Sequence, residues 1–394
     1  MPRGKREGSI FKDARGYWTA TVELPAGTDG KRRRKTIRSR DKKTVLVKLQ
    51  ALQAELKARG DLPSAEITVE GWFTYWLDNI VAETVRPTTA MNYRNLTKNH
   101  VLPAIGTVKL SNVKPEHIRR VTDRMADELG LAPSSVLKTH RVMAASFKSA
   151  VRENRVGRSP MEHMLAPRKS HPELEVLTLE ETIRVLEHVS HTPMGARWAV
   201  SLLTGARRGE VLGLTADRVT DVLDFSWQLV RIVGASKTEP VAPKDFEYKR
   251  VKGGLFLVRP KSKSGQRIMP LVDPLKSILE RHMAENTPGP SGLIFLEEGR
   301  PIGPERDTRA WQRVFAETGI NKNIRLHDLR HGFADLLFSA GVPEDILIDM
   351  MGHSTIAMSR AYRSRSDPAR ALAAAKAVSA QFALPLRISE TDAA

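Results

Sequence analysis

Four short stretches in the second half of the chain gather the residue types that carry out chemistry in proteins. They are TGARRGEVLGL with Arg207 and Glu210, KSKSGQR with Lys261 and Lys263, HDLRHGF with His327 and Arg330, and GHSTIAMSRAY with His353 and Tyr362. Core packing does not require arginine, lysine or histidine at these positions. Guanidinium and ammonium groups bind anions, imidazoles transfer protons, and a tyrosine hydroxyl can act as a nucleophile. The hydroxyl of Tyr362 is therefore either held in a core or does chemistry.

The spacing of His353 and Tyr362 places a condition on the backbone between them. A continuous helix turns about 100° per residue, so nine residues would put the two side chains on opposite faces, about 13.5 Å apart along the axis. They can share a site only if the helix breaks. Gly352 can end a helix over PEDILIDMM, and the Ser-Thr pair after His353 can cap the next one. The sequence therefore predicts a turn near residues 352–355.

The four stretches lie on mixed secondary structure within residues 177–362. TLEETIRVLEHV and GARWAVSLLTGARRGEVLGL are predicted to be helical, and Arg207 and Glu210 are expected on one helix face because they are three residues apart. The same spacing relates His327 and Arg330. Residues 223–272 are β-like, and KSKSGQR is predicted to be a hairpin tip between two strands. Helices return from GPERDTRAWQRVFAETG onward, and the Ala-rich tail is expected to be a helix.

The first half of the chain predicts two smaller regions. YWTATVELP and KRRRKTIRSR are typical of strands, and residues 42–60 are typical of a helix, so a small sheet with one helix is expected. Residues 60–66 and 166–176 are predicted linkers. The region between them is helical throughout, and its Trp72, Tyr75, Trp76 and Ile80 stripe is expected to be core. The fold class is therefore mainly α with small β elements.

Composition indicates a polyanionic partner. The 394 residues carry a net charge of +18, and residues 1–60 hold 17 Lys and Arg against 6 Asp and Glu. Concentrated positive charge of this kind most often binds nucleic acid, although a solvated basic tail is the alternative. The absence of cysteine excludes disulfides, thiolate nucleophiles and Cys-based zinc sites. No apolar run is long enough for a membrane span, and the N-terminus lacks the apolar part of a signal peptide, so a cytoplasmic protein is expected.

The ordered motifs resemble those of tyrosine site-specific recombinases, specifically phage-type integrases of the lambda class. Members carry TGxRxxE, a hairpin lysine, HxxR, GH and a tyrosine nine residues after that histidine. The corresponding segments here are residues 204–210, Lys261 or Lys263, residues 327–330, and residues 352–353 followed by Tyr362. The resemblance extends over RPTTAMNY to VRENRV, which is similar to the helical core-binding domain. Nearly the whole chain is covered, with the basic first 60 residues as the least specific part.

The resemblance implies a role for each site residue. Tyr362 would attack the scissile phosphate, giving a 3′-phosphotyrosine and a free 5′-hydroxyl, with His327 as general base. Arg207 and Arg330 would clamp the non-bridging oxygens, and His353 would donate a further hydrogen bond. A hairpin lysine would protonate the leaving oxygen. Lys261 fits the usual Lys followed by Ser or Thr better than Lys263 does, and the choice stays open.

Several neighbouring residues are given supporting roles or none. Glu210 is expected to be a buried partner that orients an arginine. Asp328 is expected to hold structure, and His331 is expected to have no chemical role. No cofactor or metal is expected. Residues 234–250, which are longer than a minimal hairpin requires, have no assigned role.

The resemblance also implies a three-domain architecture. Residues 1–60 would form an arm-type DNA-binding domain, residues 66–165 a helical core-binding domain, and residues 175–394 a mixed α/β catalytic domain with a C-terminal tail. The chain would integrate a phage or other mobile element into a bacterial chromosome, with excision as an open second direction. The partners implied are double-stranded attachment-site DNA and three further copies of the chain in a tetramer. A directionality factor and a host DNA-bending protein are candidate partners.

Two other functions remain as alternatives. A type IB topoisomerase shares the tyrosine nucleophile, although the basic N-terminal region and the core-binding pattern argue against it. A DNA-binding regulator that has lost catalysis would keep the fold, but the motif set is complete. Trapping of a phosphotyrosine separates the recombinase from the regulator, and relaxation of plasmids without site preference would favour the topoisomerase.

Overall fold

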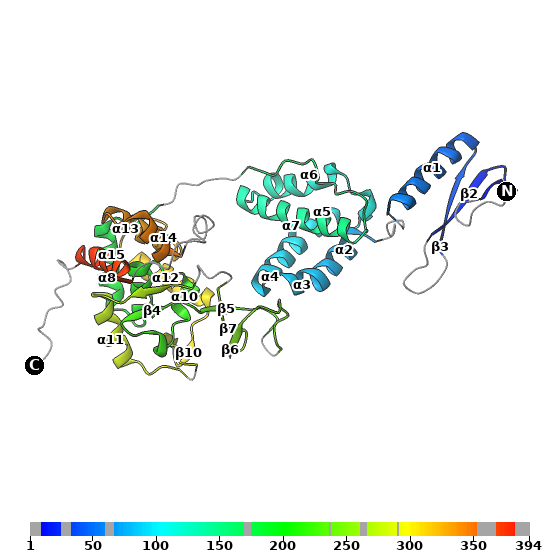
Figure 1. Ribbon diagram of the computed structural model, residues 1–394. Helices are drawn as coiled ribbons and strands as arrows, with labels where there is room; N and C mark the ends of the chain where they lie inside the picture. The colour runs from blue at the N-terminus through cyan, green and yellow to red at the C-terminus, as the bar shows by residue number, and fades with distance from the viewer. Residues whose placement is uncertain are drawn as a thin grey trace, which may run out of the picture. The chain divides into compact units, whose positions relative to one another are not determined.

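The computed structural model describes residues 9–24, 33–59, 67–168, 175–235, 238–260, 266–289, 291–352 and 368–382. Contacts divide the chain into two compact units. One unit comprises residues 1–84 and 89–170, and the other comprises residues 85–88 and 171–394. The described helices include none that is long and apolar enough to cross a membrane. Figure 1 labels helices and strands of both units, and each unit is described by itself.

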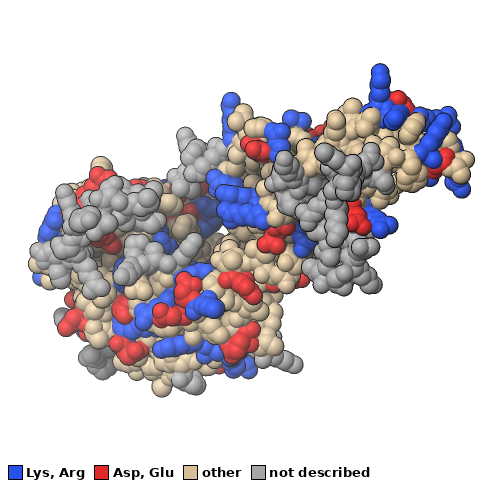
Figure 2. Space-filling view, turned by 45° about the vertical axis from the view of Figure 1, so that its right-hand side comes forward, with Lys and Arg blue, Asp and Glu red and all other residues tan. Residues whose placement is uncertain are grey.

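The N-terminal part of the first unit is a three-stranded antiparallel sheet covered by one helix. The strands β1 (Ser9–Lys12), β2 (Trp18–Leu24) and β3 (Arg33–Ser39) are followed by α1 (Lys42–Arg59). A small core of Ala20, Val22, Val45, Leu49 and Leu52 joins the sheet to the helix. The two predicted strands and the helix are confirmed, and β1 is an addition. Figure 2 shows Lys and Arg side chains (blue), with Asp and Glu (red) among them, on one face of the molecule.

The remainder of this unit is helical, as predicted. Its helical segments are α2 (Val69–Tyr75), η1 (Trp76–Val81), α3 (Ala82–Thr84), α4 (Pro87–Leu96), η2 (Thr97–Val101), α5 (Leu102–Ile105), η3 (Leu110–Asn112), α6 (Pro115–Asp123), η4 (Arg124–Glu128) and α7 (Pro133–Arg152). Trp72 and Trp76 are buried and donate hydrogen bonds to serine hydroxyls of α7, at 3.0 and 3.1 Å. Tyr75 is 37% exposed and Ile80 is half-buried, so the predicted core stripe holds for its two tryptophans.

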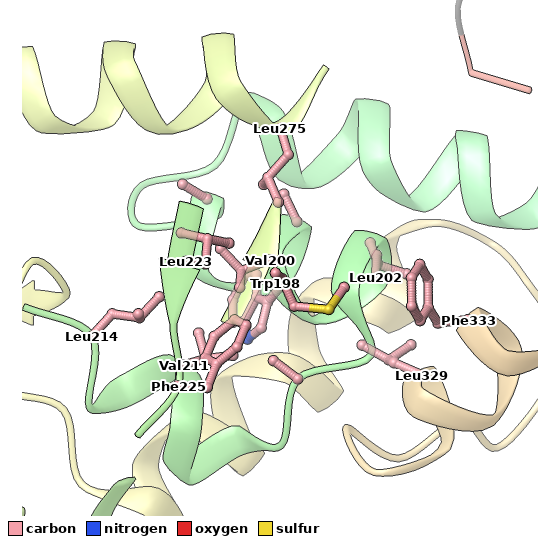
Figure 3. Packing of buried hydrophobic residues seen from close by; sticks show 14 of the residues in the cluster. Trp198, Val200, Leu202, Val211, Leu214, Leu223, Phe225, Leu275, Leu329 and Phe333 are labelled. Atoms are coloured by element: carbon pink, nitrogen blue, oxygen red, sulfur yellow. The ribbon is translucent and has the colours of Figure 1, made fainter. Parts of the chain in front are cut away.

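The second unit combines helices with short strands. Its helices are α8 (Leu179–Ser190), α9 (Ala196–Thr204), α10 (Arg208–Leu212), η5 (Ala216–Arg218), α11 (Leu275–Glu285), α12 (Pro304–Glu317), α13 (Asp328–Ser339), α14 (Glu344–Met351) and α15 (Pro368–Ala380). Its strands are β4 (Val222–Asp224), β5 (Gln228–Arg231), β6 (Tyr248–Lys252), β7 (Leu255–Val258), β8 (Ile268–Pro270), β9 (Leu296–Glu297) and β10 (Arg300–Pro301). Figure 3 shows side chains from α9, β4, α11 and α13 packed together in one core. This core holds α9, α10 and α13. Arg207 directly precedes α10, His327 directly precedes α13, and Arg330 lies in α13.

The strands of this unit form separate small sheets. One sheet has the order β5-β7-β6, and β4 pairs with β8 in another. The predicted hairpin around KSKSGQR is therefore wrong in its pairing, because its flanking strands β7 and β8 have different partners. All four residues of β7 are buried, which suits a central strand between β5 and β6 rather than one arm of a simple hairpin.

The unassigned stretch of residues 234–250 contributes to a second, smaller core. Ala235 and Phe246 pack with Ile232, Phe256 and Val258 over the β5-β7-β6 sheet. The stretch therefore extends the sheet by the strand β6 and covers part of its surface.

The tail helix α15 packs on its own chain. Ala374, Ala375, Val378 and Phe382 belong to the main core of the unit, and Arg370 forms an ion pair with Asp345 of α14 at 3.1 Å. The predicted Ala-rich helix is confirmed. Its apolar side therefore adds to the core next to α13 and α14.

Candidate active site

Two helix ends bring the described site residues together. α9 ends at Gly205 and α14 ends at Gly352, and both glycines adopt left-handed backbone conformations, with φ of 58° and 60°. Glycine is the residue that adopts this conformation without steric cost. At Gly205 a Cβ atom would also lie 2.8 Å from the Phe333 ring. The prediction that Gly352 ends its helix is confirmed, and Ser354 and Thr355 lie outside the described residues.

Arg207 lies at the start of α10 rather than on a helix face. Because α9 ends at Gly205, Arg207 has an extended backbone and precedes the first turn of the next helix. The Glu210 carboxylate accepts hydrogen bonds from the Arg207 backbone N–H at 2.9 Å and from its Nη1 at 2.7 Å. The predicted shared helix face is therefore wrong, although the predicted pairing is correct. This pairing holds the half-exposed guanidinium of Arg207 at the surface of the site.

Glu210 is buried, as predicted, and it pairs with two arginines. Its second partner is Arg267, whose Nη2 lies 3.0 Å from Oε2. Burial opposes ionisation of the Glu210 carboxyl group, but Arg267 and Arg207 outweigh it and hold its pKa below the ordinary value. The carboxylate therefore stays charged and orients both guanidinium groups.

Arg267 is the site residue that the sequence analysis missed. It is 4% exposed, and its Nη1 donates to the carbonyl oxygens of Thr204, at 3.2 Å, and Met350. Its guanidinium also lies over the Phe225 ring, 4.9 Å from the ring centroid. Arg267 is the last residue of KSKSGQR, the stretch in which the two lysines were the predicted site residues. Only its burial distinguishes it from the many exposed arginines of the chain.

Arg330 is buried beside Arg267 and makes a parallel set of bonds. It is 3% exposed, and it donates to the carbonyl oxygens of Gly205, at 2.8 Å, and Met351. Burial lowers its pKa to about 9, with contributions from the positive charges of Arg267 and Arg207. Two arginines thus join the carboxyl end of α9 to the carboxyl end of α14, where helix dipoles favour cations.

The described part of the site has more positive than negative charge. The contacts of Arg207, Arg267 and Arg330 in this part of the chain include one carboxylate, that of Glu210. Burying unbalanced cations costs free energy unless an anion compensates for them. The arrangement therefore favours binding of an anionic group, and guanidinium groups match phosphate oxygens in geometry.

His327 lies directly before α13 and next to these arginines. Its surroundings lower its pKa, first by desolvation and then through the nearby His331, Arg330 and Arg207. The His327 and His331 rings are 5.5 Å apart and nearly perpendicular. The imidazole of His327 is therefore neutral at pH 7 and is available to accept a proton.

Asp328 has the structural role that was predicted. It is 4% exposed, and its carboxylate accepts hydrogen bonds from the Arg325 backbone N–H and side chain, at 2.8 to 2.9 Å. These bonds fix the turn that leads into α13. They position His327 and Arg330 at the first turn of that helix.

Four predicted site residues cannot be placed from the structure. Lys261, Lys263, His353 and Tyr362 lie outside the described residues. Among the residues that the structure does describe, no group of three or more His, Asp and Glu side chains could hold a metal ion.

The other four tyrosines have contacts of their own. Tyr17 accepts a hydrogen bond from Arg40 at 3.3 Å, and Tyr93 stacks on Trp76. The ring centroids of Tyr75 and Trp72 are 5.8 Å apart. A hydrogen bond with Glu239 raises the pKa of the Tyr248 hydroxyl, which therefore keeps its proton at neutral pH.

Comparisons with known proteins identify the family of the chain. Residues 175–368 match the family model of the phage integrase family, and residues 68–126 match that of the phage integrase N-terminal SAM-like domain. An integrase of Saccharopolyspora erythraea is 28% identical over 94% of this chain and 95% of its own length.

Two solved structures share the fold. The Tn1549 transposon integrase in complex with a circular intermediate DNA has a TM-score of 0.62 and 20% identity, over 78% of this chain and 98% of that one. A lambda integrase tetramer bound to a Holliday junction has a TM-score of 0.54 and 14% identity, over 91% of this chain and 96% of that one. The chain belongs to the phage integrase family and is a phage-type tyrosine recombinase.

Proposed function

We propose that this enzyme recombines the attachment site of a phage or other mobile element with a site on a bacterial chromosome, through a covalent link between Tyr362 and DNA. The observation that carries the proposal is the surplus of guanidinium groups around Glu210, at the position of the family's catalytic motifs. These groups suit a phosphodiester whose charge increases during attack. Integration and excision use the same chemistry, so both directions are included.

The first chemical step forms the tyrosine–DNA bond. The Tyr362 oxygen attacks the scissile phosphorus while its proton passes to the neutral His327 imidazole. Arg207 and Arg330 hold the non-bridging oxygens, where negative charge accumulates, and His353 donates another hydrogen bond. The burial of Arg330 strengthens this effect because few water molecules screen its charge.

The same step releases a 5′-hydroxyl. The bond from phosphorus to the 5′-oxygen breaks, and a lysine, Lys261 or Lys263, supplies the proton that the leaving oxygen takes up. The 3′-phosphotyrosine keeps the phosphodiester energy, so the 5′-hydroxyl of a partner strand can reverse the step without an external energy source. Exchange of partner strands between cutting and rejoining gives recombination.

The N-terminal sheet supplies a second DNA-binding surface in this proposal. One face of the sheet packs on α1, and the other carries the cross-strand pairs Thr19 with Arg38, Thr21 with Thr36 and Glu23 with Arg34. Phe11, which pairs with Thr19, is 50% exposed on the same face. Arginines and an exposed aromatic on a sheet suit binding in a DNA groove, and this face would bind arm-type sites.

The assembly in this proposal is a homotetramer on two duplexes in the nucleoid of a bacterial host. Residues 1–60, 66–165 and 175–394 would act as the arm-binding, core-binding and catalytic domains. A directionality factor or a host DNA-bending protein would decide which direction dominates. Reconstitution with purified attachment-site DNA, with and without host extract, tests these partners.

A nicked suicide core site tests the catalytic proposal. The nick lets a short fragment diffuse away after cleavage, so the covalent intermediate accumulates and migrates slowly on a denaturing gel. The wild-type enzyme should form this complex, and Tyr362→Phe should bind the same DNA without forming it. A covalent complex from Tyr362→Phe would contradict the assignment. Relaxation of any supercoiled plasmid by the wild type, without site preference, would favour a type IB topoisomerase.

A further inference from the structure

Arg267 occupies the centre of the site without reaching its surface. Its side chain is 3% exposed, whereas that of Arg207 is 38% exposed. Arg330 is buried to the same degree, but it belongs to the HxxR motif, whereas Arg267 lies in none of the motifs. The contacts of Arg267 are with Glu210 and with the ends of α9 and α14, so its influence on the reaction passes through these groups.

Those contacts reach the segments that carry the reacting groups. Through Glu210, Arg267 is coupled to the Arg207 side chain, since one carboxylate binds both arginines. Through the carbonyl of Met350, it is bound to the last turn of α14, two residues before Gly352. The chain continues from Gly352 directly into His353.

Arg267 and Arg330 form a pair of parallel links. Arg267 binds the carbonyls of Thr204 and Met350, and Arg330 binds the next carbonyl along each helix end, those of Gly205 and Met351. Each guanidinium therefore bridges the same two helix ends. In the proposed reaction Arg330 contacts the phosphate. A shift of either helix end would therefore move the guanidinium of Arg330.

We propose that Arg267 is a positioning residue of the reaction. It sets the orientation of Arg207 through Glu210 and holds the carboxyl ends of α9 and α14 at the spacing that Arg330 requires. A lysine at this position keeps the positive charge but loses the planar fork, so it cannot bind Glu210 and both carbonyls in the same geometry. The inference rests on the proposed strand-cleavage function.

The chain offers a matched control in Arg197. This arginine is 6% exposed, its Nε lies 2.7 Å from Asp307 Oδ1, and it also bonds a backbone carbonyl and stacks on an aromatic ring. It has the same kinds of contact as Arg267 but none of its described contacts is with Arg207, Glu210 or Arg330. Arg267→Lys and Arg197→Lys should therefore cost similar stability and differ in catalysis.

The test measures single-turnover formation of the covalent complex on a nicked core site, with non-covalent affinity and thermal unfolding measured in parallel. Arg267→Lys should slow cleavage by roughly 10- to 100-fold at unchanged affinity, as small misplacements of reacting groups do. Arg197→Lys should cleave at the wild-type rate. A cleavage rate of Arg267→Lys equal to that of the wild type, or a loss no greater than that of Arg197→Lys, would overturn the proposal. An inactive wild type would instead contradict the proposed function.

A double-mutant cycle examines the route through Glu210. If Arg267 acts on Arg207 through this carboxylate, the double variant Glu210→Gln with Arg267→Lys should cleave at nearly the same rate as the slower of the two single variants. A rate loss in the double variant equal to the product of the two single losses would overturn this route.

Discussion

At the residue scale, the buried carboxylate of Glu210 is the negative partner of two guanidinium groups of the site, those of Arg207 and Arg267. Replacing it by glutamine leaves Arg207 and Arg267 without their negative partner. Glu210→Gln should lower the free energy of unfolding by about 3–5 kcal/mol, the usual cost of breaking a buried ion pair. Urea unfolding at neutral pH measures this change.

The matched control for this variant is Glu305→Gln. Glu305 pairs with Arg231 at 3.1 Å, but its side chain is 62% exposed. An exposed pair contributes about 0–1 kcal/mol, so this variant should unfold almost like the wild type. Equal destabilisation by the two substitutions would contradict the central place of Glu210.

The pH dependence of cleavage reports on His327. Its pKa lies below the ordinary value of 6.5, so the imidazole is neutral above about pH 6.5 and gains a proton only at lower pH. The single-turnover cleavage rate should be constant above that pH and fall on acidification, with an apparent pKa below 6.5. An apparent pKa at or above 6.5 in the wild type would contradict this account.

His331 gives a sharper form of the pH prediction. It is the second largest cause of the lowered pKa of His327, after desolvation. His331→Gln should therefore move the apparent pKa of cleavage upward while the rate on the alkaline plateau stays unchanged. Loss of cleavage at every pH would show that His331 itself takes part in the chemistry.

Sequence patterns predict the residues that lie in motifs and miss the one that lies between them. Arg207 with Glu210, and His327 with Arg330, are separated by three residues, so a local pattern relates each pair. Arg267 is far from all of them along the chain. Its partners are brought to it only by the fold, through the ends of α9 and α14, and no local pattern contains that information.

At the element scale, the left-handed end of α14 fixes the direction in which the chain continues toward His353. Gly352→Ala places a Cβ atom on a backbone with φ of 60° and should cost about 1 kcal/mol in the free energy of unfolding. It should also reduce cleavage, because the strain is relieved by moving the helix end. Thermal unfolding and the covalent-complex assay measure the two effects.

Gly332 is the control for this substitution. It lies inside α13 with an ordinary helical backbone, and a Cβ atom there would meet no atom within 4 Å. Gly332→Ala should stabilise the protein by about 0.5–1 kcal/mol, because alanine favours the helix. A similar loss of stability in both variants would argue against strain at Gly352.

Elements with long periodic patterns are predictable, whereas their ends and the pairing of short strands are not. The helices over residues 67–163 follow from their apolar spacing and start residues. The predicted continuous helix through Arg207 is wrong because Gly205 ends α9 in a left-handed conformation. The Phe333 ring packs where a Cβ atom of residue 205 would lie. The hairpin prediction is wrong because β7 and β8 pair with earlier strands instead of with each other. β7 pairs with β5, and β8 pairs with β4.

At the scale of the whole molecule, positive charge is concentrated where the arm-binding function is proposed. Of the net charge of +18, an excess of 11 lies in residues 1–60. Each phosphate contact contributes about 0.9 to the slope of log affinity against log salt concentration. A variant lacking residues 1–60 should therefore bind the full attachment region with a shallower salt dependence than the intact chain.

The same deletion should leave core-site cleavage intact. The core of the catalytic unit consists of residues from position 177 onward, so removal of the first 60 residues does not disturb its packing. Filter binding at several salt concentrations and the suicide-site assay measure the two properties. An unchanged salt slope would contradict a DNA-binding role for the N-terminal sheet.

The predicted domain limits can be compared with the division of the chain into two compact units. Along the sequence, the chain passes from the first unit to the second at residue 170, inside the predicted linker of residues 166–176. The first predicted linker, residues 60–66, lies outside the described residues. Composition changes predict such linkers because polar, Pro-containing segments bury little surface.

The nucleophile proposed for strand cleavage is Tyr362. The direct measurement of this assignment is the mass of the peptide that carries DNA after the wild-type enzyme is trapped on a nicked core site and digested with protease and nuclease. The expected product is a nucleotide linked through its 3′-phosphate to Tyr362. A nucleotide linked to any other residue, including Tyr248, or no linked nucleotide in a trapped complex, would contradict the assignment.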